Sequence, residues 1–232
     1  MEIKGEHQIL DLGQLGKHEC SHAIEFFQRL APGGCFEIKA CCLLSQLFFD
    51  LQQRHGLGFY WWPLERGPLV WRVKVGKPPQ GLSPTIKSVM AADRQRLNEL
   101  WRGFEFAVSF CQIDDLHQRL GELWLGLRRY IDIEEAILFP LLEAQTHRNY
   151  SATEAMRSEH REIERAMEEL NKLRSTRDCA TILETFDQPI EPMTFFQSHC
   201  NKEDMTLYSV IERVLDDAKK TELLSLIQVF EI

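Results

Sequence analysis

Two short segments each place a potential metal ligand four residues before a glutamate. They are Tyr130-x-x-x-Glu134 and His199-x-x-x-Glu203. On an α-helix, residues i and i+4 lie on one face about one turn apart, so each segment can direct two side chains at one point. In both segments a second acid and then an apolar–aromatic pair follow the glutamate. The second segment is therefore interpreted as a copy of the first.

Further matches indicate that the duplication extends beyond these segments. Arg94 corresponds to His160, and Tyr130 corresponds to His199, at nearly the same offset along the chain. A repeated offset at two landmarks favours a true internal repeat. The second copy supplies two imidazoles and the first copy none.

Imidazoles and carboxylates that meet between helices form a nitrogen and oxygen ligand set suited to iron, manganese or zinc. The sequence offers His160, His199, Glu134 and Glu203 for such a set. The phenolate of Tyr130 is a further candidate ligand, because it can bind a hard ferric ion. These five residues are the predicted metal site.

Arg94 permits a second interpretation of the same residues. Its guanidinium stays protonated and cannot bind a metal, but it can bridge two carboxylates. Without a cation, Glu134 and Glu203 would be two buried like charges, which is costly. The pattern therefore allows either a metal site or an arginine-filled cavity.

Four long helices are expected to position these side chains. The predicted helices span residues 85–111, 117–145, 152–175 and 181–217. Short connections between long helices favour antiparallel neighbours, so we expect an all-α, up-down four-helix bundle. Pro140 lies within the second predicted helix, and Pro189 and Pro192 lie within the fourth. Each should kink or interrupt its helix.

A separate α+β domain is predicted before the bundle, in the order β-α-β-α-β-β. The predicted strands are residues 8–12, 35–39, 58–62 and 69–75, and the predicted helices are 18–30 and 43–55. This domain covers residues 1–76, a proline-rich linker covers 77–84, and the bundle domain covers 85–232. The aromatic side chains of residues 59–62 are expected to be exposed and to suit a protein partner.

Composition limits the classes of function. The net charge of −8 argues against nucleic-acid binding. No long apolar run and no secretory signal is found, so neither a membrane span nor secretion is expected. Seven cysteines without a Cys-x-x-Cys pair predict thiols in a reducing cytoplasm.

The segments that carry the predicted ligands resemble the hemerythrin-like cation-binding domain. The matching text runs from Leu127 to Pro140, from Met156 to His160 and from His199 to Tyr208. The resemblance is greatest to bacterial proteins linked to nitric-oxide stress and repair of iron–sulfur centres. It implies a four-helix bundle with a non-haem di-iron centre.

The resemblance also shows how this chain departs from the family pattern. His160, His199, Glu134 and Glu203 fall on family ligand positions, whereas Arg94 and Tyr130 stand where the first two helices would each supply histidine. Since each iron of the family takes two histidines, each iron position here would keep one. The resemblance therefore implies an altered site, mononuclear or dinuclear.

Residues 1–76 resemble a family of uncharacterised domains with a sulfur-carrier-like fold. The matching stretches include 30–34 and 65–73. Where that family has a His-Asp pair after the second strand, this chain has Cys41-Cys42. Thiols next to a helix N-terminus can have a lowered pKa, which leaves a thiol enzyme as a weaker hypothesis.

Two functional hypotheses follow, and metal binding ranks first. The first is a non-haem iron protein that binds or senses oxygen or nitric oxide, or acts in a stress response to them. The second is a non-enzymatic binding or regulatory module whose bundle has lost its metal. Binding is better supported than catalysis.

Overall fold

The protein is described from a computed structural model that covers residues 8–81, 83–146, 151–186 and 192–230. Two units divide the chain. The first consists of the described residues of Met1–Thr85 and Leu224–Ile232, and the second is Ile86–Leu223. No described helix is long and apolar enough to cross a membrane.

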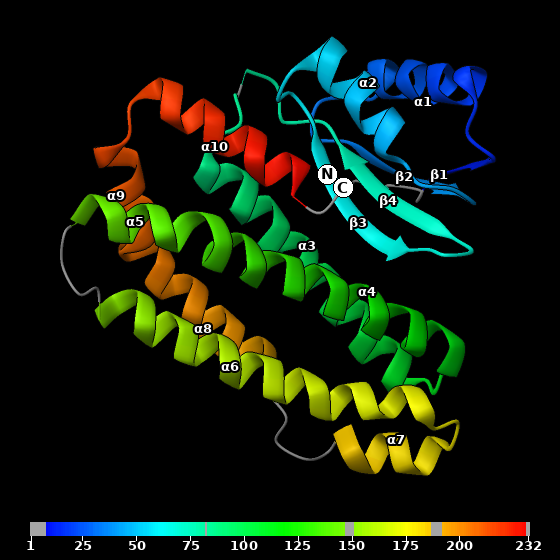
Figure 1. Ribbon diagram of the computed structural model, residues 1–232. Helices are drawn as coiled ribbons and strands as arrows, with labels where there is room; N and C mark the ends of the chain where they lie inside the picture. The colour runs from blue at the N-terminus through cyan, green and yellow to red at the C-terminus, as the bar shows by residue number, and fades with distance from the viewer. Residues whose placement is uncertain (1–7, 82, 147–150, 187–191, 231–232) are drawn as a thin grey trace. The chain divides into compact units, whose positions relative to one another are not determined.

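The first unit is a four-stranded sheet with two helices on one face (Figure 1). Its elements are β1 (Ile9–Gly13), α1 (Lys17–Arg29), β2 (Cys35–Ala40), α2 (Ser45–His55), β3 (Tyr60–Arg66) and β4 (Trp71–Gly76). The strand order is β1-β2-β4-β3, with β1 parallel to β2 and the other pairs antiparallel. The predicted order β-α-β-α-β-β is confirmed.

Alternating burial explains why β2 forms a central strand. Phe36, Ile38 and Ala40 are buried, whereas the residues between them are partly exposed, which is the period of two expected for a strand with one apolar face. That face packs on buried residues of α1 and α2, including Phe27 and Phe48.

The expected exposure of the aromatic residues after Gly58 was wrong for Phe59, Trp61 and Trp62. Phe59 and Trp61 belong to the core of the first unit, where Phe48 packs against both rings. Trp62 is also buried, and Tyr60 stacks on it. Burying such large rings stabilises the core, so Phe59, Trp61 and Trp62 offer no exposed aromatic surface to a partner, whereas Tyr60 is partly exposed.

The second unit is helical, as predicted (Figure 1). Its elements are α3 (Ile86–Ser109), α4 (Ile113–Ile133), η1 (Glu134–Leu138), α5 (Phe139–Thr146), α6 (Ser151–Asn171), η2 (Lys172–Ser175), α7 (Cys179–Phe186), α8 (Pro192–Met205) and α9 (Leu207–Val214). The helix α10 (Asp217–Val229) begins here and ends in the first unit. Within the bundle, α3 packs on α4 and α6 packs on α8.

The second predicted helix is interrupted close to Pro140, as expected. Glu134–Leu138 forms a π-helical turn, in which the N–H of Phe139 donates to the carbonyl of Glu134. Proline lacks an N–H and cannot continue the regular pattern, and single π-turns often occur at functional sites. Here the π-turn begins at a predicted ligand.

The fourth predicted helix is not continuous. It is divided into α7, α8 and α9, with Thr206 separating the last two. Pro192 is the first residue of α8, a position where a missing N–H costs nothing, rather than an interior kink. Pro189 lies outside the described residues.

The prediction that all seven cysteines are thiols was also wrong. Cys111 and Cys179 form a disulfide with their Cα atoms 5.9 Å apart, within the usual range. The bond joins the residues after α3 to the first residue of α7, which the sequence separates by 68 positions. Such a pairing depends on the bundle topology and cannot be read from spacing.

Candidate metal centre

Four of the predicted site residues come together in the interior of the bundle. Glu134 lies on η1, His160 on α6, and His199 and Glu203 on α8. All four are at most 1% exposed, and one ligand atom from each lies within 4.8 Å of the others. Tyr130, at the end of α4, is also fully buried beside them.

The two imidazoles converge on one point. Their Nε2 atoms are 2.8 Å apart. The Nε2 of His160 lies 3.1 Å from Oε2 of Glu134, and the Nε2 of His199 lies 2.5 Å from Oε1 of Glu203. The ring of His160 is held in place by stacking on Phe139. Two nitrogen and two oxygen donors thus face the same small volume.

Two further glutamates orient the imidazoles from outside. Oε1 of Glu135 lies 2.7 Å from Nδ1 of His160, and Oε2 of Glu159 lies 2.9 Å from Nδ1 of His199. A carboxylate that accepts the Nδ1–H leaves the Nε2 lone pair free and fixes the ring orientation, as is usual for metal-binding histidines. Sequence reasoning missed both roles, although each glutamate adjoins a predicted ligand.

Two tyrosine hydroxyls occupy the opposite side of the glutamates. Tyr130 donates to Oε2 of Glu203 over 2.6 Å, and Tyr208 lies within reach of Oε1 of Glu134, at 3.2 Å. The hydroxyls are 3.1 Å apart. Each glutamate therefore presents one oxygen to the histidines and the other to the tyrosines. Sequence reasoning did not assign Tyr208 to the site, although Tyr208 is the aromatic residue of the second segment that corresponds to Phe139 in the first.

Comparison with known proteins supports the same interpretation. A family model described as the hemerythrin HHE cation binding domain matches residues 88–211. The match covers more than half of the chain and includes every residue of the centre. The chain belongs to this family. No curated protein and no solved structure matches it.

The geometry favours one of the two forms of altered site that the resemblance left open. The resemblance implied two metal positions that each keep one histidine. In this hemerythrin-type bundle both Nε2 atoms instead meet at a single point, and tyrosine hydroxyls fill the space beyond the glutamates. The adjacent helices α6 and α8 bring the two rings together.

Burial and hydrogen bonding shift the pKa values of the centre in opposing directions. Burial opposes a charged imidazole, but hydrogen bonds with Glu134 and Glu203 raise the pKa of His199 to about 10. Burial alone would raise the pKa of Glu134, and hydrogen bonds with the two histidines lower it to about 2. Burial, with repulsion from Glu134, raises the pKa of Glu203 to about 7. The proton on His199 thus helps to balance the negative charge of the two buried carboxylates.

The contact between His199 and Glu203 tests whether a metal suits this centre. Their Nε2 and Oε1 atoms are 2.5 Å apart, yet Oε1 has no aligned hydrogen-bond donor. Nδ1–H donates to Glu159, so the proton that the raised pKa of His199 keeps at neutral pH lies on Nε2, between the two facing atoms. When that proton leaves, both atoms direct lone pairs at the same point, so the donor set fits a metal ion in its place.

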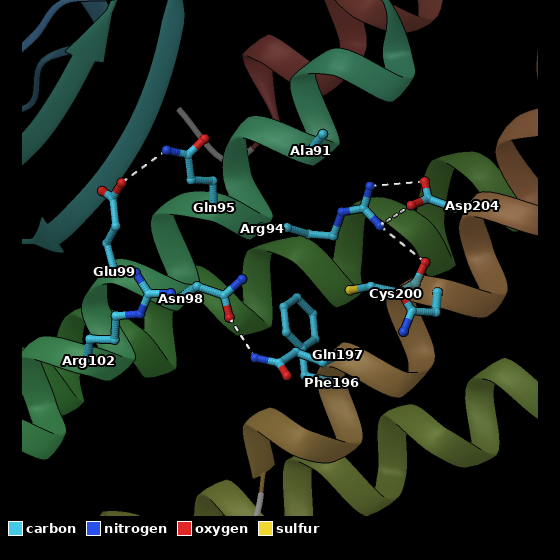
Figure 2. A pocket seen from close by; sticks show the side chains of 11 residues that line it. Ala91, Arg94, Gln95, Asn98, Glu99, Arg102, Phe196, Gln197, Cys200 and Asp204 are labelled. Atoms are coloured by element: carbon cyan, nitrogen blue, oxygen red, sulfur yellow. Dashed lines mark hydrogen bonds and ion pairs between the residues drawn. The ribbon is translucent and has the colours of Figure 1, made fainter. Parts of the chain in front are cut away.

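Arg94 does not fill the cavity, which corrects the second interpretation of the sequence. Its guanidinium binds the carbonyl of Cys200 at 3.1 Å and both oxygens of Asp204 at 3.0 and 3.2 Å (Figure 2). It also lies over the ring of Tyr208, 5.7 Å from the centroid. The tyrosine hydroxyls already occupy the outer oxygens of Glu134 and Glu203, so the arginine is directed toward α8 instead.

Proposed function

We propose that this protein binds one non-haem metal ion, and that the ion is iron. The ligands would be His160, His199, Glu134 and Glu203. The observation that carries the proposal is the convergence of two Nε2 atoms, each aimed by a carboxylate at Nδ1, on two buried glutamate oxygens. Such a two-nitrogen, two-oxygen set suits iron, and the match to the hemerythrin family favours iron over the other metals that the set could bind.

The tyrosines support a single ion rather than two. The outer glutamate oxygens that a second ion would use accept hydrogen bonds from Tyr130 and Tyr208. Burial first, and then the charge of Glu203, raise the pKa of both phenols well above the usual value. Both hydroxyls therefore keep their protons. In this proposal Tyr130 positions Glu203 and is not itself a ligand.

Small diatomic molecules are the proposed ligands of the loaded protein. A reduced iron with an open coordination position can bind oxygen or nitric oxide. The chain contributes a buried setting, in which Phe139 stacks on His160 and Phe196 packs on Tyr130. A water-excluding site of this kind favours binding of small neutral molecules over hydrolytic chemistry.

The test is metal stoichiometry after anaerobic reconstitution with ferrous iron. We expect about one iron per chain, because the described residues hold one such four-donor set, and loss of binding in His160→Ala and in His199→Ala. The matched control is His117→Ala, since His117 binds only carbonyl groups of Leu173 and Thr176 among the described contacts. Retention of less than about a tenth of an equivalent by the wild-type protein would refute the proposal.

A further inference from the structure

A surface pocket lies beside the metal centre. It has a volume of about 420 Å³ and is lined by residues of α3 and α8 (Figure 2). Arg94, Phe196, Cys200 and Asp204 are among them. Figure 2 shows the Arg94 side chain extending across the pocket from α3 to Asp204 and to the backbone of Cys200 on α8.

A single layer of side chains separates this pocket from the centre. Arg94 lies over the ring of Tyr208, 5.7 Å from its centroid, and Phe196 meets the ring of Tyr130 edge to face at 5.1 Å. The hydroxyls of both tyrosines contact Glu203. A solute that passed Arg94 would therefore meet the ring of Tyr208, whose hydroxyl contacts Glu134 and Glu203.

We propose that this pocket is the entrance to the metal centre and that the Arg94–Asp204 ion pair is the barrier that closes it. The proposal rests on the proposed function for the metal and small molecules bound at the centre. The path from the pocket past Arg94 depends only on the fold. The guanidinium at the entrance favours small neutral or anionic solutes, such as nitric oxide, nitrite or azide, over cations.

The ion pair has the properties of a barrier that can open. The side chain of Asp204 is 35% exposed and that of Arg94 is 13% exposed, so breaking the pair costs less than breaking a fully buried one. Lys87 lies 3.8 Å from Asp204 and can pair with it when Arg94 moves. Rotation of such side chains is fast compared with binding.

The histidine side of the centre is more firmly closed. His160 and His199 are each 1% exposed, and their outward nitrogens are bound to Glu135 and Glu159. Phe139 covers one imidazole face, and the guanidinium of Arg157 lies over Phe139. A solute on that side would have to displace the ligands themselves.

Nitration of Tyr208 by tetranitromethane tests the entrance without any metal. Metal-free wild-type protein would be compared with Arg94→Ala and Asp204→Asn, and nitrotyrosine at residue 208 measured by peptide mass spectrometry. We expect a rise of about tenfold or more in both variants, because the site opens in a larger fraction of molecules. Arg128→Ala is the control, since Arg128 forms an ion pair of similar type with Glu164 elsewhere in the bundle.

The direction of the electrostatic effect strengthens this test. Burial raises the pKa of Tyr208 and the charge of Arg94 partly offsets the rise, so losing Arg94 would by itself slow a reagent that attacks phenolate. Faster nitration in Arg94→Ala therefore reports access, and Asp204→Asn tests the same barrier from its other partner. Unchanged nitration in both folded variants would overturn the entrance, whether or not the protein binds iron. Faster nitration in a protein that takes up no iron would leave the entrance standing and reject the proposed function.

Discussion

The carboxylates that hold the histidine Nδ1 atoms determine how well the imidazoles are aimed. We predict that Glu159→Ala weakens metal binding by about 10- to 100-fold, because His199 loses the acceptor that orients it. Competition with a chelator of known affinity measures the change. Glu164→Ala is the matched control on the same helix, because Glu164 pairs with Arg128 and not with a histidine. Equal losses in the two variants would contradict the assigned role.

Tyr130 offers a second prediction at this scale. Tyr130→Phe should remove the shorter of the two hydrogen bonds to Oε2 of Glu203 and lower the free energy of unfolding of the metal-free protein by about 1–3 kcal/mol. Iron binding should persist, and the ferric wild-type protein should lack a phenolate-to-iron charge-transfer band. A band that disappears in Tyr130→Phe would instead identify Tyr130 as a ligand, as the sequence first suggested.

Metal affinity should also depend on pH. The pKa of His199 is raised to about 10, so in the metal-free protein this group is protonated at neutral pH and must lose that proton to bind a metal. Affinity should therefore increase by about tenfold per pH unit as pH rises from about 7 toward 9, with one proton released per ion. Competition titrations across this range measure the slope, and a flat profile would contradict it.

The sequence predicted which four side chains meet inside the bundle, because their chemistry and spacing coincide. His199 and Glu203 share a helical face in a pattern that the tertiary structure preserved. The residues that form hydrogen bonds with these four side chains were harder to predict. Glu159 adjoins His160 in sequence but binds His199, and Tyr208 belongs to a separate helix. Such pairings arise only from how helices pack, which local spacing does not encode.

At the scale of elements, the helices were predicted more securely than their interruptions. Apolar periodicity identified the long helices of residues 85–175, but not the π-turn that begins at Glu134 or the break at Thr206. The final helix, α10, was missed, although Leu223, Leu224 and Ile227 form a buried helical stripe. Where a helix is interrupted depends on how its side chains and backbone groups pack and bond with neighbouring helices. The helix propensity of the local sequence does not determine it.

The disulfide should stabilise the short helix α7. Eight residues are too few for a helix to be stable alone. We predict that the double variant Cys111→Ser, Cys179→Ser lowers the free energy of unfolding by up to about 4 kcal/mol, because the bond closes a long loop. Urea denaturation measures this. Cys35→Ser, which changes an exposed free thiol, serves as the control and should have little effect.

At the scale of the whole molecule, the first unit is built from two separate parts of the chain, one before the second unit and one after it. Residues from Leu224 onward group with the α+β unit. The amide of Gln228 donates to the carbonyls of Leu57 and Phe59 at 3.1 and 2.8 Å, and Val229 packs against the same core. The residues of the metal centre all lie within Ile86–Leu223.

This arrangement predicts that stability and metal binding can be changed separately. Gln228→Ala should leave two carbonyls of the first unit unpaired and lower its free energy of unfolding by about 1–3 kcal/mol, measured by denaturant titration with tryptophan fluorescence. Iron stoichiometry should not change, because no residue of the centre is altered. Glu222→Ala, an exposed change in the same helix, should affect neither property. Loss of iron binding in Gln228→Ala would show that the centre depends on how the C-terminal residues are held.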